Sequence, residues 1–159
     1  AVPRPSPEGS HHMKLAEVLD ASRVRTDLSL TSKKRALEEI SGLLAGRDGL
    51  SQADIFNALM AREKLGSTGL GHGVAIPHGR MADSRTTVGA FIRLNHGVDY
   101  DAHDGEAVDL VFGLIVPQNA TEDHLKLLAA VAEKFSDEDF CAQLRAAESP
   151  EAAAELLNG

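Results

Sequence analysis

The segment from Leu65 to Arg80 has the residue types of an anion-binding site, because it sets a histidine among closely spaced glycines. Five glycines lie between positions 66 and 79, and glycine lets backbone N–H groups approach a ligand without an obstructing side chain. The segment has no Gly-Lys-Ser/Thr ending, and its central glycines precede a predicted strand, so it is not a P-loop or a dinucleotide fingerprint. By spacing alone, a phosphate-binding loop and a plain turn are equally good interpretations.

His78 is the candidate nucleophile, and it stands between Pro77 and Gly79. An imidazole with an ordinary pKa of about 6.5 is largely neutral at pH 7. One ring nitrogen can then attack phosphorus while the other donates a hydrogen bond to a fixed carbonyl. The alternative is a turn histidine with a satisfied hydrogen bond, which is the commoner interpretation of an isolated histidine.

The elements around this segment predict a single layered α/β domain, because helical and strand-like patterns alternate along the chain. The most hydrophobic strand, Val108–Val116, is expected at the centre of the sheet. Val74–Ile76 is predicted as an edge or terminating strand that ends at Pro77 and delivers His78 at its carboxyl end. The other predicted strands are 23–28 and 87–94, and 95–105 is predicted to be a polar turn.

Helices are predicted where apolar residues recur at helical spacing behind a capping residue. The predicted helices span residues 15–19, 33–45, 52–63, 122–135, 137–147 and 151–157, and the expected N-caps are Ser32, Ser51, Thr121, Ser136 and Ser149.

Composition narrows the possible classes of protein. The net charge of −8 over 159 residues argues against a nucleic-acid partner. The longest apolar stretches are far shorter than the roughly 18 residues of a membrane span, so a soluble protein is expected. The single cysteine, Cys141, excludes an internal disulfide framework and is expected to pack as a small hydrophobe. Residues 1–12, with Gly-Ser-His-His, are expected to be a vector-derived leader, which leaves 13–159 as the domain.

Two stretches resemble a known active-site signature. Residues 62–71 read Arg-Glu-Lys-Leu-Gly-Ser-Thr-Gly-Leu-Gly, and residues 73–79 read Gly-Val-Ala-Ile-Pro-His-Gly. Together they resemble the signature of the fructose/mannitol-type IIA components of the bacterial phosphoenolpyruvate phosphotransferase system. Residues 32–37, Pro117 and 121–128 resemble the nitrogen-regulatory branch. The resemblance implies the mixed sheet flanked by helices of that fold over residues 13–159.

The resemblance also implies roles for individual residues. His78 would accept a phosphoryl group from a small histidine phosphocarrier protein, with Arg62 and His124 beside it. An arginine offers a planar fork of donors to phosphoryl oxygens, and His124 would lie in the first turn of its helix, where N–H groups favour a phosphate. The remaining residues of the expected phosphoryl-binding loop are Gly66, Ser67, Thr68, Gly69, Gly71, Gly73 and Gly79. A surface salt bridge for Arg62 and a solvated position for His124 are the alternatives.

The sequence departs from the familiar pattern at His72 and at Arg80. His72, His78 and His124 together could imitate a metal site, but neither a cysteine nor a well-spaced carboxylate completes the set, so no metal and no cofactor is expected. His96 and His103 lie among aspartates in the polar turn and are interpreted as solvated residues.

The resulting hypothesis is a cytoplasmic phosphoryl carrier of the nitrogen-regulatory type, which controls partners such as potassium transport systems through its phosphorylation state. One alternative is a sugar-specific IIA component that passes the phosphate to a IIB protein. The other is a non-catalytic regulatory binding module. The oligomeric state, the regulated proteins and the active form are left open by the sequence.

Overall fold

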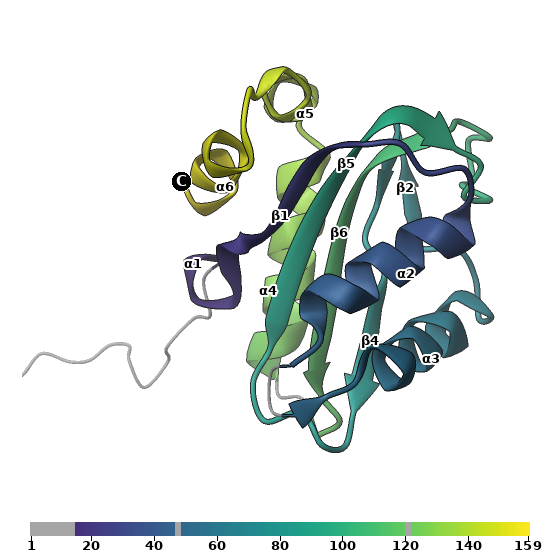
Figure 1. The fold of residues 1–159 in the computed structure, drawn as a ribbon, viewed down its shortest axis with the longest axis vertical. Coiled ribbons are helices and arrows are strands. Elements are labelled where there is room, and N and C mark those ends of the chain that lie inside the picture. Colours follow the sequence, from purple (N-terminus) through teal and green to yellow (C-terminus); the bar gives the residue numbers. More distant parts are fainter. Residues whose placement is uncertain (1–14, 47–48, 120–121) are drawn as a thin grey trace, which may run out of the picture.

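The computed structural model describes residues 15–46, 49–119 and 122–159, so the expected leader, with Met13 and Lys14, and the expected cap Thr121 lie outside the described residues. The described residues form a mixed α/β fold with an open sheet flanked by helices, as predicted (Figure 1). The elements, in chain order, are α1 (Leu15–Val18), β1 (Leu19–Leu28), α2 (Lys33–Leu44), α3 (Gln52–Glu63), β2 (Gly69–Gly71), β3 (Val74–Ala75), β4 (His78–Met81), β5 (Val88–Val98), β6 (Val108–Pro117), α4 (Glu122–Phe135), α5 (Glu138–Ala146) and α6 (Pro150–Asn158).

β6 lies at the centre of the sheet, which confirms the prediction for its most hydrophobic strand. The strand order is β1-β5-β6-β3-β2, and β4 also pairs with β6. β6 is antiparallel to β5 but parallel to β3 and β4, so the sheet is mixed. Because β3 and β4 follow one another along the same side of β6, the short segment between them is held against the central strand.

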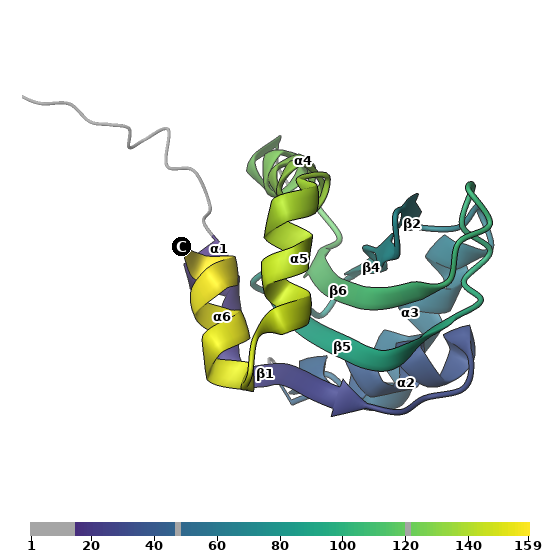
Figure 2. The ribbon, with the colours of Figure 1, turned by 90° about the horizontal axis from the view of Figure 1, so that it is seen from above.

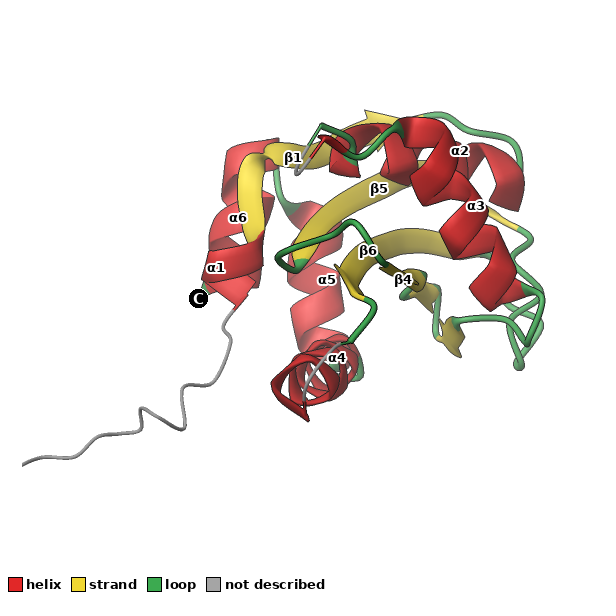
Figure 3. Ribbon diagram, turned by 90° about the horizontal axis from the view of Figure 1, so that it is seen from below, coloured by secondary structure: helices red, strands yellow, loops and turns green. Residues whose placement is uncertain are grey.

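The helices cover the sheet on two faces and make two hydrophobic cores. α2 and α3 lie on one face, α4 and α5 on the other, and α6 lies beside α1 and β1 (Figures 2 and 3). Side chains along a strand point alternately to the two faces. Phe91 and Phe112 therefore enter the core with α4–α6, whereas Ile92 and Val111 enter the core with α2 and α3.

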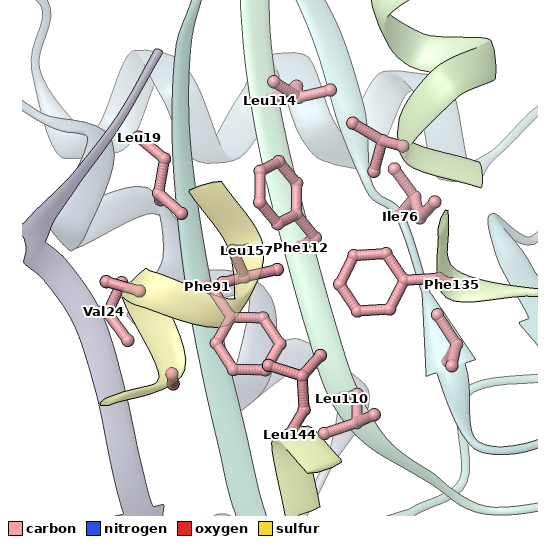
Figure 4. Close-up of a cluster of buried hydrophobic side chains, with 14 of the residues drawn as sticks. Leu19, Val24, Ile76, Phe91, Leu110, Phe112, Leu114, Phe135, Leu144 and Leu157 are labelled. Atoms are coloured by element: carbon pink, nitrogen blue, oxygen red, sulfur yellow. The ribbon is translucent and has the colours of Figure 1, made fainter. Parts of the chain in front are cut away.

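Aromatic packing anchors α4 to the sheet. Phe135, at the end of α4, lies 6.1 Å from Phe91 and 5.9 Å from Phe112 between ring centroids (Figure 4). Phe140 of α5 meets the same ring edge-on at 5.7 Å. Truncating a buried phenylalanine of this kind costs about 3–5 kcal/mol. None of the described helices combines the length and the apolar character needed to cross a membrane.

Three predicted N-caps are confirmed and one is wrong. The side chains of Ser32, Ser51 and Ser149 accept from backbone N–H groups of the helices they begin. α5 is instead capped by Asp137, whose carboxylate accepts from the N–H groups of the next turn. The Ser136 hydroxyl instead turns back to α4, where it donates to the Glu133 carbonyl.

Pairing with β5 and β6 extends two strands beyond their predicted limits. β1 begins at Leu19 rather than Arg23, in register with Gly89 of β5. β5 continues to Val98, which pairs with Val108, so residues 95–98 of the predicted polar turn 95–105 are strand. Cross-strand partners stabilise extended backbone where the local sequence has only a weak preference.

The prediction for Val74–Ile76 needs two corrections. The strand ends at Ala75 and is not at an edge, because Gly69–Gly71 forms a further strand, β2, antiparallel to it. The glycine-rich segment is therefore partly a β-hairpin rather than irregular backbone throughout. His78 follows the strand but begins β4 instead of standing at the carboxyl end of β3.

Candidate active site

His78 is positioned by the break between β3 and β4. Ala75 pairs with Val111 and His78 with Leu114 along β6, and the two intervening residues belong to neither strand. Pro77 has no N–H to contribute to the ladder, although its carbonyl accepts from the Leu114 N–H at 3.0 Å. The carbonyl of Ile76 lies 2.9 Å from Nδ1 of the His78 ring.

This contact defines the state of the imidazole. A carbonyl oxygen can only accept, so Nδ1 carries the proton and Nε2 has the free electron pair. Burial lowers the pKa of His78 below its ordinary value, and the charges of Arg62 and Arg80 act in the same direction, against the Ile76 hydrogen bond and Glu63. The half-buried ring is thus a neutral nucleophile at pH 7.

Arg62 reaches the same place from the last turn of α3. Its Nη1 donates to the carbonyl of Gly66 at 2.8 Å, so the side chain is held by the turn that follows its own helix. A guanidinium has five N–H donors, and one such bond leaves others for a ligand. Arg62 and His78 line the same two cavities.

The larger cavity, of about 450 Å³, lies between α3, α4 and the ends of β4 and β6. His124, from the first turn of α4, lines it, and its Nδ1 is 2.5 Å from the hydroxyl of Thr87. The described geometry therefore brings together His78, Arg62 and His124, which are 16 to 62 residues apart in the chain. Leu65 and Leu125, which are 83% and 52% exposed, add an apolar rim.

The smaller cavity, of about 340 Å³, shares Arg62, His78 and Leu128 with the larger one. Ser67, Thr68 and Gly69 of the predicted loop line it. His103 lines it too: this residue is exposed in a turn, as expected, but the turn lies at the mouth of the cavity. No sequence pattern indicated that His103 lies near His78, because only the fold brings the β5–β6 connection to this cavity.

The predicted glycine loop divides into residues at the site and residues elsewhere. Gly66 provides the carbonyl that binds Arg62, and Gly79 lines the larger cavity. Gly79 serves close packing as well, because a Cβ there would lie 3.2 Å from the backbone of Ala58 in α3. Gly71 and Gly73 line neither of the two His78 cavities.

Gly71 and Gly73 lie apart from the other residues of the predicted loop. The hairpin turn between β2 and β3 carries them toward the α5 side of the molecule. A Cβ on Gly71 would approach the Asp104 carboxylate at 3.1 Å, and one on Gly73 would meet Nη2 of Arg145 at 2.6 Å. The backbone at Gly73 has a φ of +85°, a conformation that favours glycine at this turn.

Arg80 is a second cation that sequence reasoning left outside the site. It lies two residues beyond His78 on β4, so both side chains leave the same face of the strand, and it lines the larger cavity. His72 lies at the hairpin turn with the Arg145 guanidinium on its carbonyl, away from His78. In the described ranges no three histidine, cysteine or acidic side chains converge as metal ligands would.

Comparison with known proteins places this geometry in context. Residues 17–159 match the family described as "Phosphoenolpyruvate-dependent sugar phosphotransferase system, EIIA 2". A nitrogen regulatory protein of Klebsiella oxytoca is 44% identical over 146 residues, which cover 91% of this chain and 90% of that protein.

Two solved structures resemble the fold. The crystal structure of nitrogen regulatory protein IIA-Ntr from Neisseria meningitidis matches with a TM-score of 0.87 at 48% identity, covering 90% of this chain and 98% of that one. The crystal structure of IIA mannitol from Escherichia coli matches with a TM-score of 0.71 at 23% identity, covering 87% and 97%, and shares the fold.

Proposed function

The chain belongs to the EIIA 2 family of the phosphoenolpyruvate-dependent sugar phosphotransferase system, and we propose that His78 is its phosphoryl acceptor. The observation that supports this most directly is the hydrogen bond from Nδ1 of His78 to the Ile76 carbonyl. It leaves Nε2 as the free nucleophile in a cavity that also contains Arg62 and His124.

The donor in this proposal is a phosphohistidine on a small histidine phosphocarrier protein. The electron pair of Nε2 forms the new N–P bond as the N–P bond of the donor breaks, and the donor imidazole leaves with the electron pair of the broken bond. The proton on Nδ1 stays in place, and the Ile76 carbonyl stabilises the positive charge that the attacking ring gains. Arg62 and His124 then stabilise the charge on the phosphoryl oxygens, so catalysis consists of positioning and electrostatics.

We place the protein in the nitrogen-regulatory branch, as a phosphoryl carrier of the cytoplasm. Support comes from its 44% and 48% identity to two nitrogen regulatory proteins, against 23% to the mannitol IIA component. In this role the phosphorylation state of His78 controls contacts with regulated proteins, and potassium transport systems are the expected class. The sugar-specific alternative differs in passing the phosphate to a IIB protein.

One incubation tests the chemistry. The protein is mixed with phosphoenolpyruvate, the first enzyme of the system and the phosphocarrier, and intact mass is measured before and after mild acid treatment. A single acid-labile phosphate that is absent from His78→Ala is expected. A folded wild-type protein that takes no phosphate would be a binding module, and an acid-stable phosphate would indicate a serine ester.

A second incubation separates the two branches. Phosphorylated protein is mixed with purified fructose-type and mannitol-type IIB proteins, and loss of its phosphate is followed over time. Retention of the phosphate over the period in which a sugar-specific IIA component is emptied is the expected result. Rapid transfer to either IIB protein would assign the chain to the sugar-specific alternative.

A further inference from the structure

Glu63 carries a nearly buried carboxylate directly beside the candidate active site. It is the last residue of α3 and follows Arg62 in the chain, and only 3% of its side chain is exposed. A buried charge is costly unless it is paired and hydrogen-bonded. Its surroundings must therefore supply donors, and those donors identify what the carboxylate holds in place.

Four donors converge on this carboxylate. Nζ of Lys33 lies 2.9 Å from Oε1, and the backbone N–H of Thr68 donates to the same oxygen at 3.2 Å. The hydroxyl of Thr68 donates to Oε2, as does the Tyr100 hydroxyl at 3.2 Å. Burial and the charge of Glu63 raise the pKa of Tyr100, so its hydroxyl remains protonated and can donate. Nζ of Lys33 also lies 4.6 Å from the centre of the Tyr100 ring.

These contacts fix both ends of the turn between α3 and β2. Glu63 lies at the start of the turn and Thr68 at its end, and Gly66 lies between them. The Gly66 N–H donates to the Glu63 carbonyl at 3.0 Å, and the Gly66 carbonyl accepts from the Arg62 guanidinium. The orientation of Arg62 therefore depends on a turn that the Glu63 carboxylate holds closed.

We propose that Glu63 is a positioning residue for phosphoryl transfer: it holds the turn that orients Arg62 beside His78, while Lys33 compensates its charge. This role rests on the proposed function of His78. A misplacement of about 1 Å at a group that orients the reacting atoms can slow a reaction about a hundredfold. The turn, rather than a direct contact with substrate, transmits the effect.

Glu63 also acts on the His78 ring through its charge, which raises the pKa of His78. The charged or titratable side chains that line the cavities at His78 are Arg62, Arg80, His103 and His124. Removing the carboxylate leaves the positive charges of Arg62, Arg80 and Lys33 uncompensated. The pKa of His78 should then fall further, a change that a purely structural role for Glu63 would not produce.

The test compares Glu63→Gln with Glu38→Gln, the same substitution at an exposed ion pair on α2. Phosphoryl transfer is timed over a range of phosphocarrier concentrations, per folded molecule, and the pKa of His78 is measured by NMR titration of its ring. For Glu63→Gln we expect the maximal rate to fall about tenfold or more, with the half-saturating donor concentration changed less than about twofold. The His78 titration should shift to lower pH, and Glu38→Gln should match wild type in all three quantities.

A second variant protects the test against misfolding. Thr68→Val keeps the side-chain volume but removes the hydroxyl that donates to Glu63, and a smaller loss of maximal rate is expected from it. Wild-type rates and an unchanged His78 titration in folded Glu63→Gln would overturn the role of Glu63. If wild-type protein itself takes no phosphate, the proposed function fails instead. The titration of His78 alone then decides whether Glu63 raises the pKa of the His78 ring.

Discussion

Two parts of the glycine-rich segment, here called its first and second ends, look alike in sequence but have different surroundings in the structure. The first end, residues 66–69, borders the cavity that contains His78 and Arg62. The second end, residues 71–73, lies beside an ion pair in which Arg145 contacts both carboxylate oxygens of Asp109, at 2.9 Å each. Each end thus places backbone near an arginine, yet only the first lines a cavity with His78.

The difference shows what distinguishes a site from a scaffold in this molecule. At the first end, Arg62 bonds a single carbonyl and keeps donors for a ligand. At the second end, the guanidinium of Arg145 is occupied by Asp109 and by the His72 carbonyl. Arg145 thus uses three of its five N–H donors on protein oxygens, two of them on a carboxylate that neutralises its charge, and it has less left for an anion than Arg62.

The largest expected contrast lies between His78, in the cavity that the first end borders, and His72, in the second end. His78→Gln should abolish phosphorylation, because it removes the nucleophile, while His72→Gln should leave the transfer rate unchanged. Intact-mass measurement after incubation with the donor system checks both variants. Phosphorylation of folded His78→Gln at a normal rate would move the acceptor to another residue.

The two arginines give the next contrast. Arg62→Ala should slow transfer by about a hundredfold, since it removes charge stabilisation at the phosphoryl group, with little change in donor affinity. Arg145→Ala should lower the melting temperature and leave transfer per folded molecule unchanged. Stopped-flow rates and donor-binding isotherms measured on both variants decide. Equal losses of rate and affinity in Arg62→Ala would place this arginine in the partner interface instead.

A smaller effect concerns pH. Burial lowers the pKa of His78, so the neutral ring should persist below the ordinary pKa of about 6.5 and transfer should continue there. The unfolded chain binds this proton at higher pH than the folded one, so stability should be lost as pH falls from about 6.5 through the folded pKa. Melting temperatures of wild type and His78→Gln across this window measure the difference. The same slope in both proteins would contradict the lowered pKa.

The sequence alone predicted those elements that depend on neighbouring residues in the chain. The serine caps of α2, α3 and α6 follow from side chains that bond N–H groups three residues ahead. The continuous apolar run of β6 follows from burial on both faces of the sheet. The prediction that His124 lies beside His78 came from the resemblance to a known signature and not from periodicity.

Contacts between segments that are distant in the chain could not be predicted from the sequence. His103 reaches the site because Tyr100, three residues earlier, is anchored by Glu63 and Ser67. β3 separates Gly73 from His78, and it is held in place by pairing with β6, which no local sequence pattern predicts. The buried charge of Glu63 is also invisible in a helix end that reads as an ordinary polar terminus.

The smallest effect on transfer is expected for a substitution at Gly73. This substitution tests most directly whether the second end of the segment contributes to phosphoryl transfer. In Gly73→Ala the new Cβ would clash with Arg145 and Asp109 at a positive φ, which should cost about 1–3 kcal/mol of unfolding free energy. Transfer per folded molecule should nevertheless match wild type, because this backbone does not face His78.

Gly79→Ala, in β4 beside His78, is the matched control at the site itself. Its Cβ would press on the backbone of Ala58 and move β4, and with it the adjacent His78, away from α3. This variant should therefore lose transfer rate as well as stability. Denaturant unfolding and transfer kinetics on both variants separate the two quantities. A folded Gly73→Ala protein with impaired transfer would mean that the second end of the segment contributes to the anion site after all, and that the hairpin couples the two ends.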